Sequence, residues 1–361
     1  MKMTRRVKVH VGLRCNARCK FCYYWDKLDL PNPPTEEIKA KLRYAKKHGI
    51  KDIDFSGGEP TIRADFPELV SYARQLGFRY ICVITNGIRL ASREYFRELA
   101  KYGLNDILFS IEGHNAEVHE YLTQVPGSFG KINKAIQYAK EFGIKLRTNT
   151  TVTSNNHKYL PELANYLVGI HPDAVNFILF NDWCSADKVV RDMACKYSDA
   201  PSYLRESIDI LNPSVRKVTV RYIPFCFMVG YEKHICNLLQ KKYDPDEWND
   251  AIKMRLLGEI KKTNTQNLIF ILREFKSYLS AIVKFKLKPH EFFHDKEIER
   301  MREGYTKSSM CRKCKYFYIC DGLEDSYVNE IGFSELMPII GRKIRDSLYY
   351  RREYTLQWDG E

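Results

Sequence analysis

The chain has 361 residues, and its 58 basic and 45 acidic side chains give a formal net charge of +13. No run of about 18 apolar residues occurs and no signal-peptide pattern opens the chain, which excludes a membrane-spanning helix and predicts a cytoplasmic protein. The 11 cysteines indicate metal binding or catalysis, because the cytosol keeps thiols reduced and does not favour disulfides.

The first half of the chain alternates strand-like and helix-like segments. The predicted strands are 7–13, 52–55, 80–85, 106–111, 145–150 and 174–180. The predicted helices are 35–48, 65–76, 92–102, 130–142 and 157–168. This order predicts parallel strands joined by right-handed crossovers, and therefore an α/β fold, a partial (β/α)6 barrel of the TIM type.

The regular alternation ends after Phe180. We expect a helix over 203–211, one more strand over 217–223, and then a mainly helical stretch over 246–288 that leads to a cysteine-rich end. Because the length exceeds that of most single domains, we expect a barrel domain and a smaller, mainly helical C-terminal domain. We predict their bounds as 1–200 and 201–361.

Polar or glycine-rich residues follow each of the first five predicted strands. In chain order they are Cys15, Cys19 and Cys22, then Ser56–Pro60, Thr85–Gly87, Ser110–Gly113 and Thr148–Thr150. In a parallel barrel these positions all lie at the C-terminal rim, where the active sites of barrels are built.

The three cysteines of "CNARCKFC" (15–22) can direct three thiolates at one metal centre. Zinc would need a fourth ligand for a structural site, or an open position for catalysis. A 4Fe-4S cluster with three cysteine ligands leaves one iron open to another molecule. The loop offers no histidine and no fourth cysteine, which favours the cluster.

Cys-x3-Cys-x2-Cys with Phe21 before the last cysteine, followed by "GGEP" at 57–60, resembles the radical S-adenosylmethionine (SAM) superfamily. The resemblance covers about residues 7–180. It implies that the cluster on Cys15, Cys19 and Cys22 binds SAM through its open iron. It also implies that the reduced cluster cleaves SAM to methionine and a 5′-deoxyadenosyl radical, which removes a hydrogen atom from a substrate.

The resemblance further implies a set of residues that bind SAM. They are Phe21, Gly57, Gly58, Glu59, Thr85, Asn86, Ser110 and Asn149. The two glycines would let the backbone approach the methionine moiety, Glu59 would accept a hydrogen bond from its ammonium, and Asn149 would lie near the ribose. Ser110 and Asn149 could equally satisfy the ends of their strands. Glu112 departs from the family, where relatives usually have aspartate.

A second cysteine group, Cys311, Cys314 and Cys320, closes the chain, and Cys226 and Cys236 lie upstream. The pattern resembles the auxiliary-cluster domains called SPASM and twitch. The resemblance implies a second 4Fe-4S cluster on Cys226, Cys311, Cys314 and Cys320. Cys226 is preferred to Cys236 because it follows a strand-like segment. Structural zinc is the alternative, since zinc sites often begin with two closely spaced cysteines.

The expected function is oxidation or cross-linking of a small sugar-like or nucleotide-like metabolite, or of a peptide, with a flavodoxin or ferredoxin as electron donor. We expect no leader-binding module ahead of the first strand, which disfavours a peptide without excluding it. The alternative is a non-catalytic iron-sulfur or zinc protein that binds nucleic acid through its basic surface, although no RNA-binding module is recognisable. No catalytic acid or base is predicted, and Asn181, Asp182, Trp183 and Tyr222 are only candidates to line the pocket.

Overall fold

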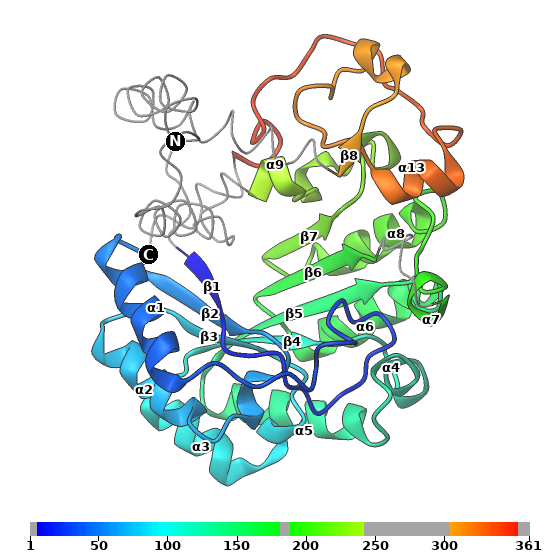
Figure 1. Cartoon of the computed structure of the whole chain (residues 1–361). Coiled ribbons are helices and arrows are strands. Elements are labelled where there is room, and N and C mark those ends of the chain that lie inside the picture. The colour runs from blue at the N-terminus through cyan, green and yellow to red at the C-terminus, as the bar shows by residue number, and fades with distance from the viewer. Residues whose placement is uncertain (1–5, 181–187, 242–303, 353–361) are drawn as a thin grey trace.

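The computed structural model describes residues 6–180, 188–241 and 304–352. Seven parallel strands form one curved sheet in the order of the chain (Figure 1). They are β1 (Arg6–His10), β2 (Asp52–Ser56), β3 (Ile81–Thr85), β4 (Asp106–Ser110), β5 (Lys145–Val152), β6 (Ala174–Leu179) and β7 (Lys217–Arg221). Each strand pairs with its successor, so β1 and β7 form the two edges.

The strands are connected by helices, of which the longer ones cover the convex face of the sheet. The helices are α1 (Thr35–Lys47), α2 (Phe66–Gln75), α3 (Arg93–Tyr102), α4 (Ala116–Thr123), α5 (Ser128–Glu141), α6 (Leu160–Ile170), α7 (Lys188–Arg191) and α8 (Pro201–Leu211). The sequence encodes their ends locally. For example, the side chain of Ser92 accepts a hydrogen bond from Tyr95 N–H to start α3, and Gly103 ends that helix with φ of +116°.

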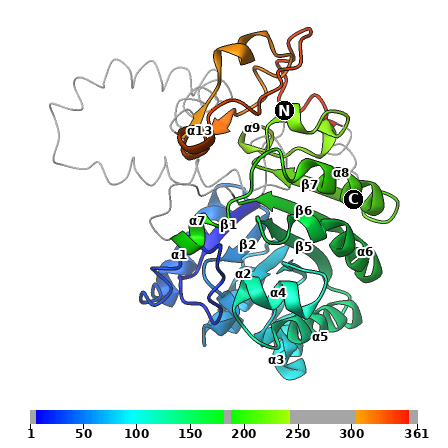
Figure 2. The same ribbon diagram turned by 90° about the vertical axis from the view of Figure 1, so that its right-hand side faces the viewer.

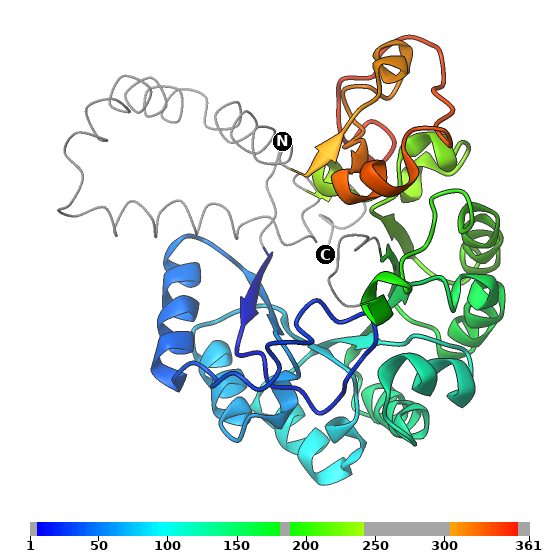
Figure 3. The same cartoon turned by 45° about the vertical axis from the view of Figure 1, so that its right-hand side comes forward.

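Alternation along each strand separates the two faces of the sheet. In β4, Ile107 and Phe109 are buried in the core that the helices share, and such burial contributes about 2 kcal/mol for a large side chain. Asp106, Leu108 and Ser110 lie on the other face. Figure 3 shows the helices as an outer arc around the strands, so this second face is the concave one.

The predicted partial barrel is confirmed, with one correction to its count. The sheet has seven strands instead of six, because α8 carries the chain back to β7, which pairs with β6 over five residues. The domain boundary at residue 200 stays a prediction, although the sheet itself extends to Arg221. Helix α4 was not predicted, because its eight residues carry only a weak apolar repeat. The predicted helical stretch 246–288 lies outside the described residues.

The C-terminal residues 304–352 lie beyond β7, at the edge of the sheet opposite β1 (Figures 1 and 2, orange to red). They contain a small antiparallel pair, β8 (Tyr305–Thr306) and β9 (Leu323–Glu324), and helix α13 (Asp325–Ile331). The short helix α9 (Leu238–Lys241) follows β7. Within the part of the chain described here, we find no helix with the length and apolar character to cross a membrane.

Candidate active site

The loop that carries Cys15, Cys19 and Cys22 is fixed by backbone hydrogen bonds to the residues after β2. Val11 N–H donates to Ser56 O (2.8 Å), Gly58 N–H to Gly12 O (2.9 Å) and Glu59 N–H to Arg14 O (2.8 Å). The loop after β1 therefore continues the pairing of the two strands past their ends. Figure 3 shows this deep-blue segment inside the arc of helices.

Gly57 and Gly58 are required by the same loop. Gly57 has φ of +143°, and a Cβ atom there would lie 2.0 Å from Gly12 O. A Cβ atom on Gly58 would lie 2.2 Å from the carbonyl oxygens of Leu13 and Arg14. The close neighbour of these glycines in the structure is thus the backbone of the cysteine loop. Any larger residue would push that loop away.

Glu59 is buried and joins the loops after β2 and β3. Its Oε1 atom accepts hydrogen bonds from Thr61 N–H (3.1 Å), Thr61 Oγ1 (2.6 Å) and Thr85 Oγ1 (2.8 Å). Its Oε2 atom accepts one from Asn86 N–H (2.8 Å). Burial raises its pKa, and the bonds from Thr61, Asn86 and Thr85 oppose that rise.

Asn86 extends this network to the cysteine loop. Its Nδ2 atom donates to Asn16 Oδ1 (2.8 Å) and lies 3.9 Å from Cys15 Sγ. The sequence analysis missed Asn16, although its position beside Cys15 is a signal that could have identified it. Glu59 and Asn86 together fix the relative positions of three loops at the rim.

The three thiols of the loop are partly buried, and burial raises the pKa of Cys15 to about 11. Ala17 N–H lies 3.4 Å from Cys15 Sγ, an N–H to sulfur hydrogen bond. On its far side the loop is held by Lys20 N–H, which donates to Leu122 O (2.9 Å) of α4. Phe21 packs edge-on against Phe180 with ring centroids 6.5 Å apart.

A row of polar side chains crosses the concave face near the same rim. Ser110, Asn149, Asn176 and Thr219 are successive partners across β4, β5, β6 and β7. Thr219 Oγ1 donates to Asn176 Oδ1 (2.5 Å). The sequence analysis did not single out Asn176 and Thr219, although Asn176 is the one polar residue of β6 and Thr219 lies between two valines of β7. The row joins the predicted positions Ser110 and Asn149 into one surface.

The model of the radical SAM superfamily matches residues 9–167, a range that contains the cysteine loop, the two glycines and the strand ends described above. Residues 9–167 are a radical SAM domain. Members of this superfamily use SAM and a 4Fe-4S cluster, and the match to their model covers this part of the chain.

Named relatives support the assignment and differ in what they act on. The chain is 33% identical over 162 residues to an AdoMet-dependent heme synthase of Oleidesulfovibrio alaskensis, covering 44% of this chain and 41% of that protein. It is 28% identical over 222 residues to a GTP 3′,8-cyclase of Aquifex aeolicus, covering 55% and 68%. The chain thus spans about two fifths of the heme synthase.

A crystal structure of methylornithine synthase has the same fold. It superposes with a TM-score of 0.51 over 74% of this chain and 85% of that one, at 17% identity. At this identity the likeness concerns the fold alone.

The concave face of the radical SAM domain fits a polar ligand at Asn149. The amide oxygen of Asn149 is buried and has no hydrogen-bond partner among the described residues. A buried oxygen without a donor costs about 1–3 kcal/mol, so such positions usually receive a partner. SAM offers hydroxyl and ammonium donors, and Asn149 is suited to accept from one of them.

Glu112 lies at the end of β4 and is fully covered. Its Oε2 atom accepts a hydrogen bond from Thr151 N–H (2.7 Å), and its own N–H donates to His119 Nδ1 (3.2 Å). Burial raises the pKa of Glu112 to about 8, against the smaller opposite effect of the Thr151 N–H. The longer carboxylate thus reaches the neighbouring strand, which gives it a structural partner.

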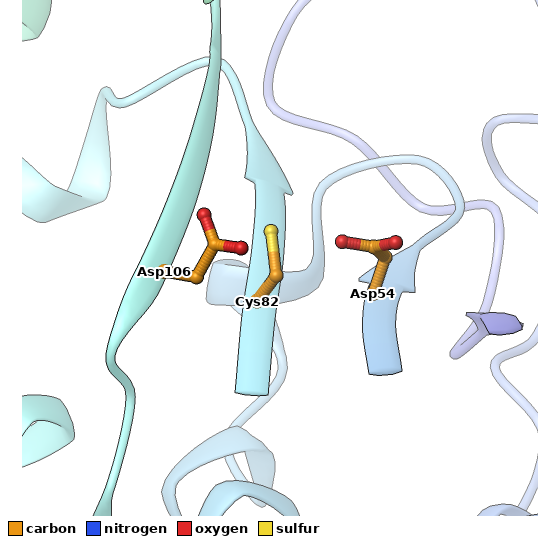
Figure 4. A group of neighbouring side chains, drawn as sticks. All are labelled: Asp54, Cys82 and Asp106. Atoms are coloured by element: carbon orange, nitrogen blue, oxygen red, sulfur yellow. The ribbon is translucent and has the colours of Figure 1, made fainter. Parts of the chain in front are cut away.

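The opposite end of the concave face holds a buried ion cluster. Asp54, Cys82 and Asp106 are partners on β2, β3 and β4, and Figure 4 shows their side chains close together. Their ligand atoms lie within 4.8 Å of one another, as in a metal site. However, Arg147 NH2 binds Asp54 (2.9 Å) and Asp106 (2.8 Å), and Arg6 binds both as well. Two guanidinium groups already neutralise the two carboxylates, so we assign the cluster a structural role and no metal.

The four cysteines predicted for the auxiliary site surround one cavity. Cys226, Cys311, Cys314 and Cys320 line it together with Tyr316 and Phe317. Burial raises the pKa of Cys226 to about 12, with a smaller contribution from the other three thiols. Cys236 is buried and does not line this cavity.

Neither cysteine site forms a tight group of three sulfur atoms within the described residues. Among the described residues, only Asp54, Cys82 and Asp106 form a group of three ligand atoms within 4.8 Å. No three thiols of either site are that close together. Four thiolates on one zinc ion would lie about 3.8 Å apart, given Zn–S bonds of about 2.3 Å. The described residues thus contain no preformed group of three thiols with the spacing that one zinc ion needs.

The sequence analysis named four residues as candidates to line the pocket, and the structure describes one of them. Tyr222, the candidate beside the auxiliary site, directly follows β7 and has φ of +61°. Asn181, Asp182 and Trp183 lie outside the described residues.

Proposed function

We propose that this chain is a radical SAM enzyme with two 4Fe-4S clusters. Cys15, Cys19 and Cys22 would hold the SAM-binding cluster, and the four cysteines of the C-terminal cavity would hold an auxiliary cluster. When bound, the first cluster supplies reductive cleavage of SAM and the 5′-deoxyadenosyl radical. The observation that carries the proposal is the meeting of the cysteine loop, the Gly57–Glu59 turn and the polar row at one rim.

The chain's own residues would bind and orient SAM. Backbone pairing with Gly58 and Glu59 holds the cysteine loop over the concave face, and Asn86 ties that loop to the end of β3. Asn149 would accept a hydrogen bond from the ligand, since its amide oxygen is otherwise unsatisfied. Phe21 and Phe180 would shield one side of the site from water.

A second cluster favours a net oxidation or a new bond, because an auxiliary cluster with four cysteine ligands can accept an electron and has no open iron for substrate. The substrate class we propose is a small sugar-like or nucleotide-like metabolite, or a peptide. The heme synthase and the GTP cyclase differ in their named products. The relatives therefore do not select among these substrates.

The test is 5′-deoxyadenosine formation after anaerobic reconstitution, with dithionite and SAM. The wild-type chain should form it, and the Cys15→Ala/Cys19→Ala/Cys22→Ala variant should not. The wild type should bind about eight irons, four for each cluster. Cys226→Ala should lose about half of the iron, whereas the matched Cys236→Ala should keep it. A cluster-loaded wild type that never forms 5′-deoxyadenosine would contradict the proposal and favour a non-catalytic binding protein.

A further inference from the structure

Two chain segments beside the C-terminal cavity pair to form a continuous outer face. Lys315 N–H donates to Ile339 O (2.6 Å), and Ile344 N–H donates to Lys315 O (2.9 Å). Cys314 and Ile340 form an antiparallel bridge between them. We call the surface made by residues 307–318 and 336–345 the basic face. It is the outer wall of the cavity, because Cys311, Cys314 and Pro338 also line that cavity.

The basic face is one-sided in charge. It contains Lys307, Arg312, Lys313, Lys315, Arg342, Lys343 and Arg345, and neither segment has an acidic residue. Lys307 and Lys343 donate to the backbone carbonyls of Phe317 and Cys314, and Lys315 lies 3.8 Å from Glu232. The side chains of Arg312, Lys313, Arg342 and Arg345 are exposed. This leaves a cluster of cationic groups directed at solvent.

Large apolar side chains lie among these charges. The exposed fractions are 49% for Met310, 46% for Tyr318, 65% for Met337 and 71% for Ile340. Arg345 stacks on the ring of Tyr318 at 4.8 Å. Exposed apolar side chains grouped within a charged rim are typical of protein interfaces. A surface that only contacts phosphates would have little use for methionine and isoleucine.

The surface around the first cysteine loop is different. There Arg18 pairs with Asp29 (3.0 Å) and Lys27 with Asp26 (3.8 Å), so carboxylates lie beside two of its basic side chains. On the basic face, by contrast, neither segment has an acidic residue, which favours charge complementarity to an acidic partner there.

We propose that the basic face docks an acidic one-electron carrier protein of the flavodoxin or ferredoxin kind. This inference rests on the proposed function, since it gives the auxiliary cluster its redox partner. When bound, the auxiliary cluster would supply one electron and return to its oxidised state, and the carrier would accept that electron. No bond forms or breaks in this step. Because Cys311 and Cys314 belong to the basic face and line the cavity, a cluster held there would lie next to the docked protein.

The experiment measures binding of a purified acidic flavodoxin to the full, cluster-loaded chain by calorimetry, at low and at high salt. Binding should weaken as salt rises. Arg312→Glu/Lys313→Glu/Arg342→Glu should weaken it at least about tenfold, because close like charges replace attractive pairs. The matched control is Lys131→Glu/Lys134→Glu/Lys140→Glu on α5, which reverses the same number of exposed charges on another face and should change binding less than about twofold.

A second variant distinguishes specific docking from non-specific electrostatic attraction. Met337→Ser/Ile340→Ser keeps every charge, and it should also weaken flavodoxin binding. Equal losses in the α5 control, no loss in either basic-face variant, or no binding by the wild type would overturn the proposal. So would binding of a single-stranded oligonucleotide that the triple variant abolishes while flavodoxin binding persists.

Iron content distinguishes a failure of the docking proposal from a failure of the proposed auxiliary cluster. Each variant should retain about eight irons and an unchanged electron paramagnetic resonance spectrum, so that weaker binding is a property of the surface. If the wild type holds only about four irons, the proposal of an auxiliary cluster is wrong whatever the binding result. If it holds both clusters and does not bind the carrier, the docking proposal alone fails.

Discussion

The two cysteine sites occupy equivalent places at opposite edges of the sheet. Cys15 comes five residues after the end of β1, and Cys226 comes five residues after the end of β7. The first site takes its three cysteines from one short loop, braced by backbone bonds to the adjacent strand. The second draws Cys226 together with cysteines more than 80 residues later in the chain. One site is local and the other depends on tertiary folding.

The buried ion cluster on the concave face provides the test with the largest expected effect. It asks whether both cysteine sites depend on the same sheet. Arg147→Leu leaves Asp54 and Asp106 with Arg6 alone, and we expect it to lower the free energy of unfolding by about 3–5 kcal/mol. Both cysteine sites should be lost together, because the sheet carries them both. Chemical denaturation monitored by circular dichroism measures the effect.

The control for this variant is Arg93→Leu, which removes an exposed pair with Glu141 and should cost less than about 1 kcal/mol. An Arg147→Leu chain as stable as the control would show that the buried cluster is dispensable.

Gly58→Ala should damage the first site alone. The added Cβ atom would meet two carbonyl oxygens of the cysteine loop at 2.2 Å, so the loop must move. We expect a stability loss of about 1–3 kcal/mol and a fall from about eight irons to about four, with the auxiliary signal retained. Iron analysis and electron paramagnetic resonance measure this.

Gly130→Ala on α5 is the matched substitution, because nothing lies within 4 Å of its added Cβ atom. It should keep all the iron and stabilise the helix by up to about 1 kcal/mol. Loss of the auxiliary signal in Gly58→Ala would mean that the two sites are coupled.

Glu112 makes the first site sensitive to pH. Its pKa is raised to about 8 by burial, so the folded chain retains a proton that the unfolded chain releases near pH 4.5. Stability contributed by this proton is complete below the unfolded pKa and is lost as pH rises towards 8, by up to about 1.4 kcal/mol per pH unit. Glu112→Gln should remove that slope between pH 6 and 8.

Denaturation curves at several pH values test the slope. The exposed Glu117→Gln on α4 is the control, and it should leave the pH profile of the wild type unchanged. If Glu112→Gln has the wild-type profile, the carboxyl group titrates in its usual range.

The sequence predicted the barrel well, and it named residues of the first site that the structure brings together, because both rest on local signals. The strand ends, the cysteine spacing and the two glycines lie within short segments, and backbone geometry links them. Asn176 and Thr219 could not be placed in the polar row, because only the register of β6 and β7 brings them beside Asn149. The choice of Cys226 over Cys236 likewise rested on resemblance, and folding alone brings Cys226 to the cavity.

The turn at Tyr222 provides the test with the smallest expected effect. It asks whether the backbone conformation of this residue positions the second site. In the described part of the chain, three non-glycine residues have positive φ, and two of them, Gln124 and His171, end helices, where this conformation is common. Tyr222 instead follows β7, and the next residue is fixed by Asn237, which donates to Ile223 O (2.7 Å) and accepts from Ile223 N–H (3.3 Å). A left-handed conformation costs about 1–2 kcal/mol for a residue with a Cβ atom.

We therefore expect Tyr222→Gly to be about 1 kcal/mol more stable than Tyr222→Ala, since both remove the ring and only glycine tolerates the positive φ. At Lys134, inside α5, the same pair should have the opposite order, with alanine more stable by about 1 kcal/mol. If the turn positions Cys226, Tyr222→Gly should also retain more auxiliary iron than Tyr222→Ala. The same order at both positions would show that the turn at Tyr222 relaxes without cost, and that the second site does not depend on it.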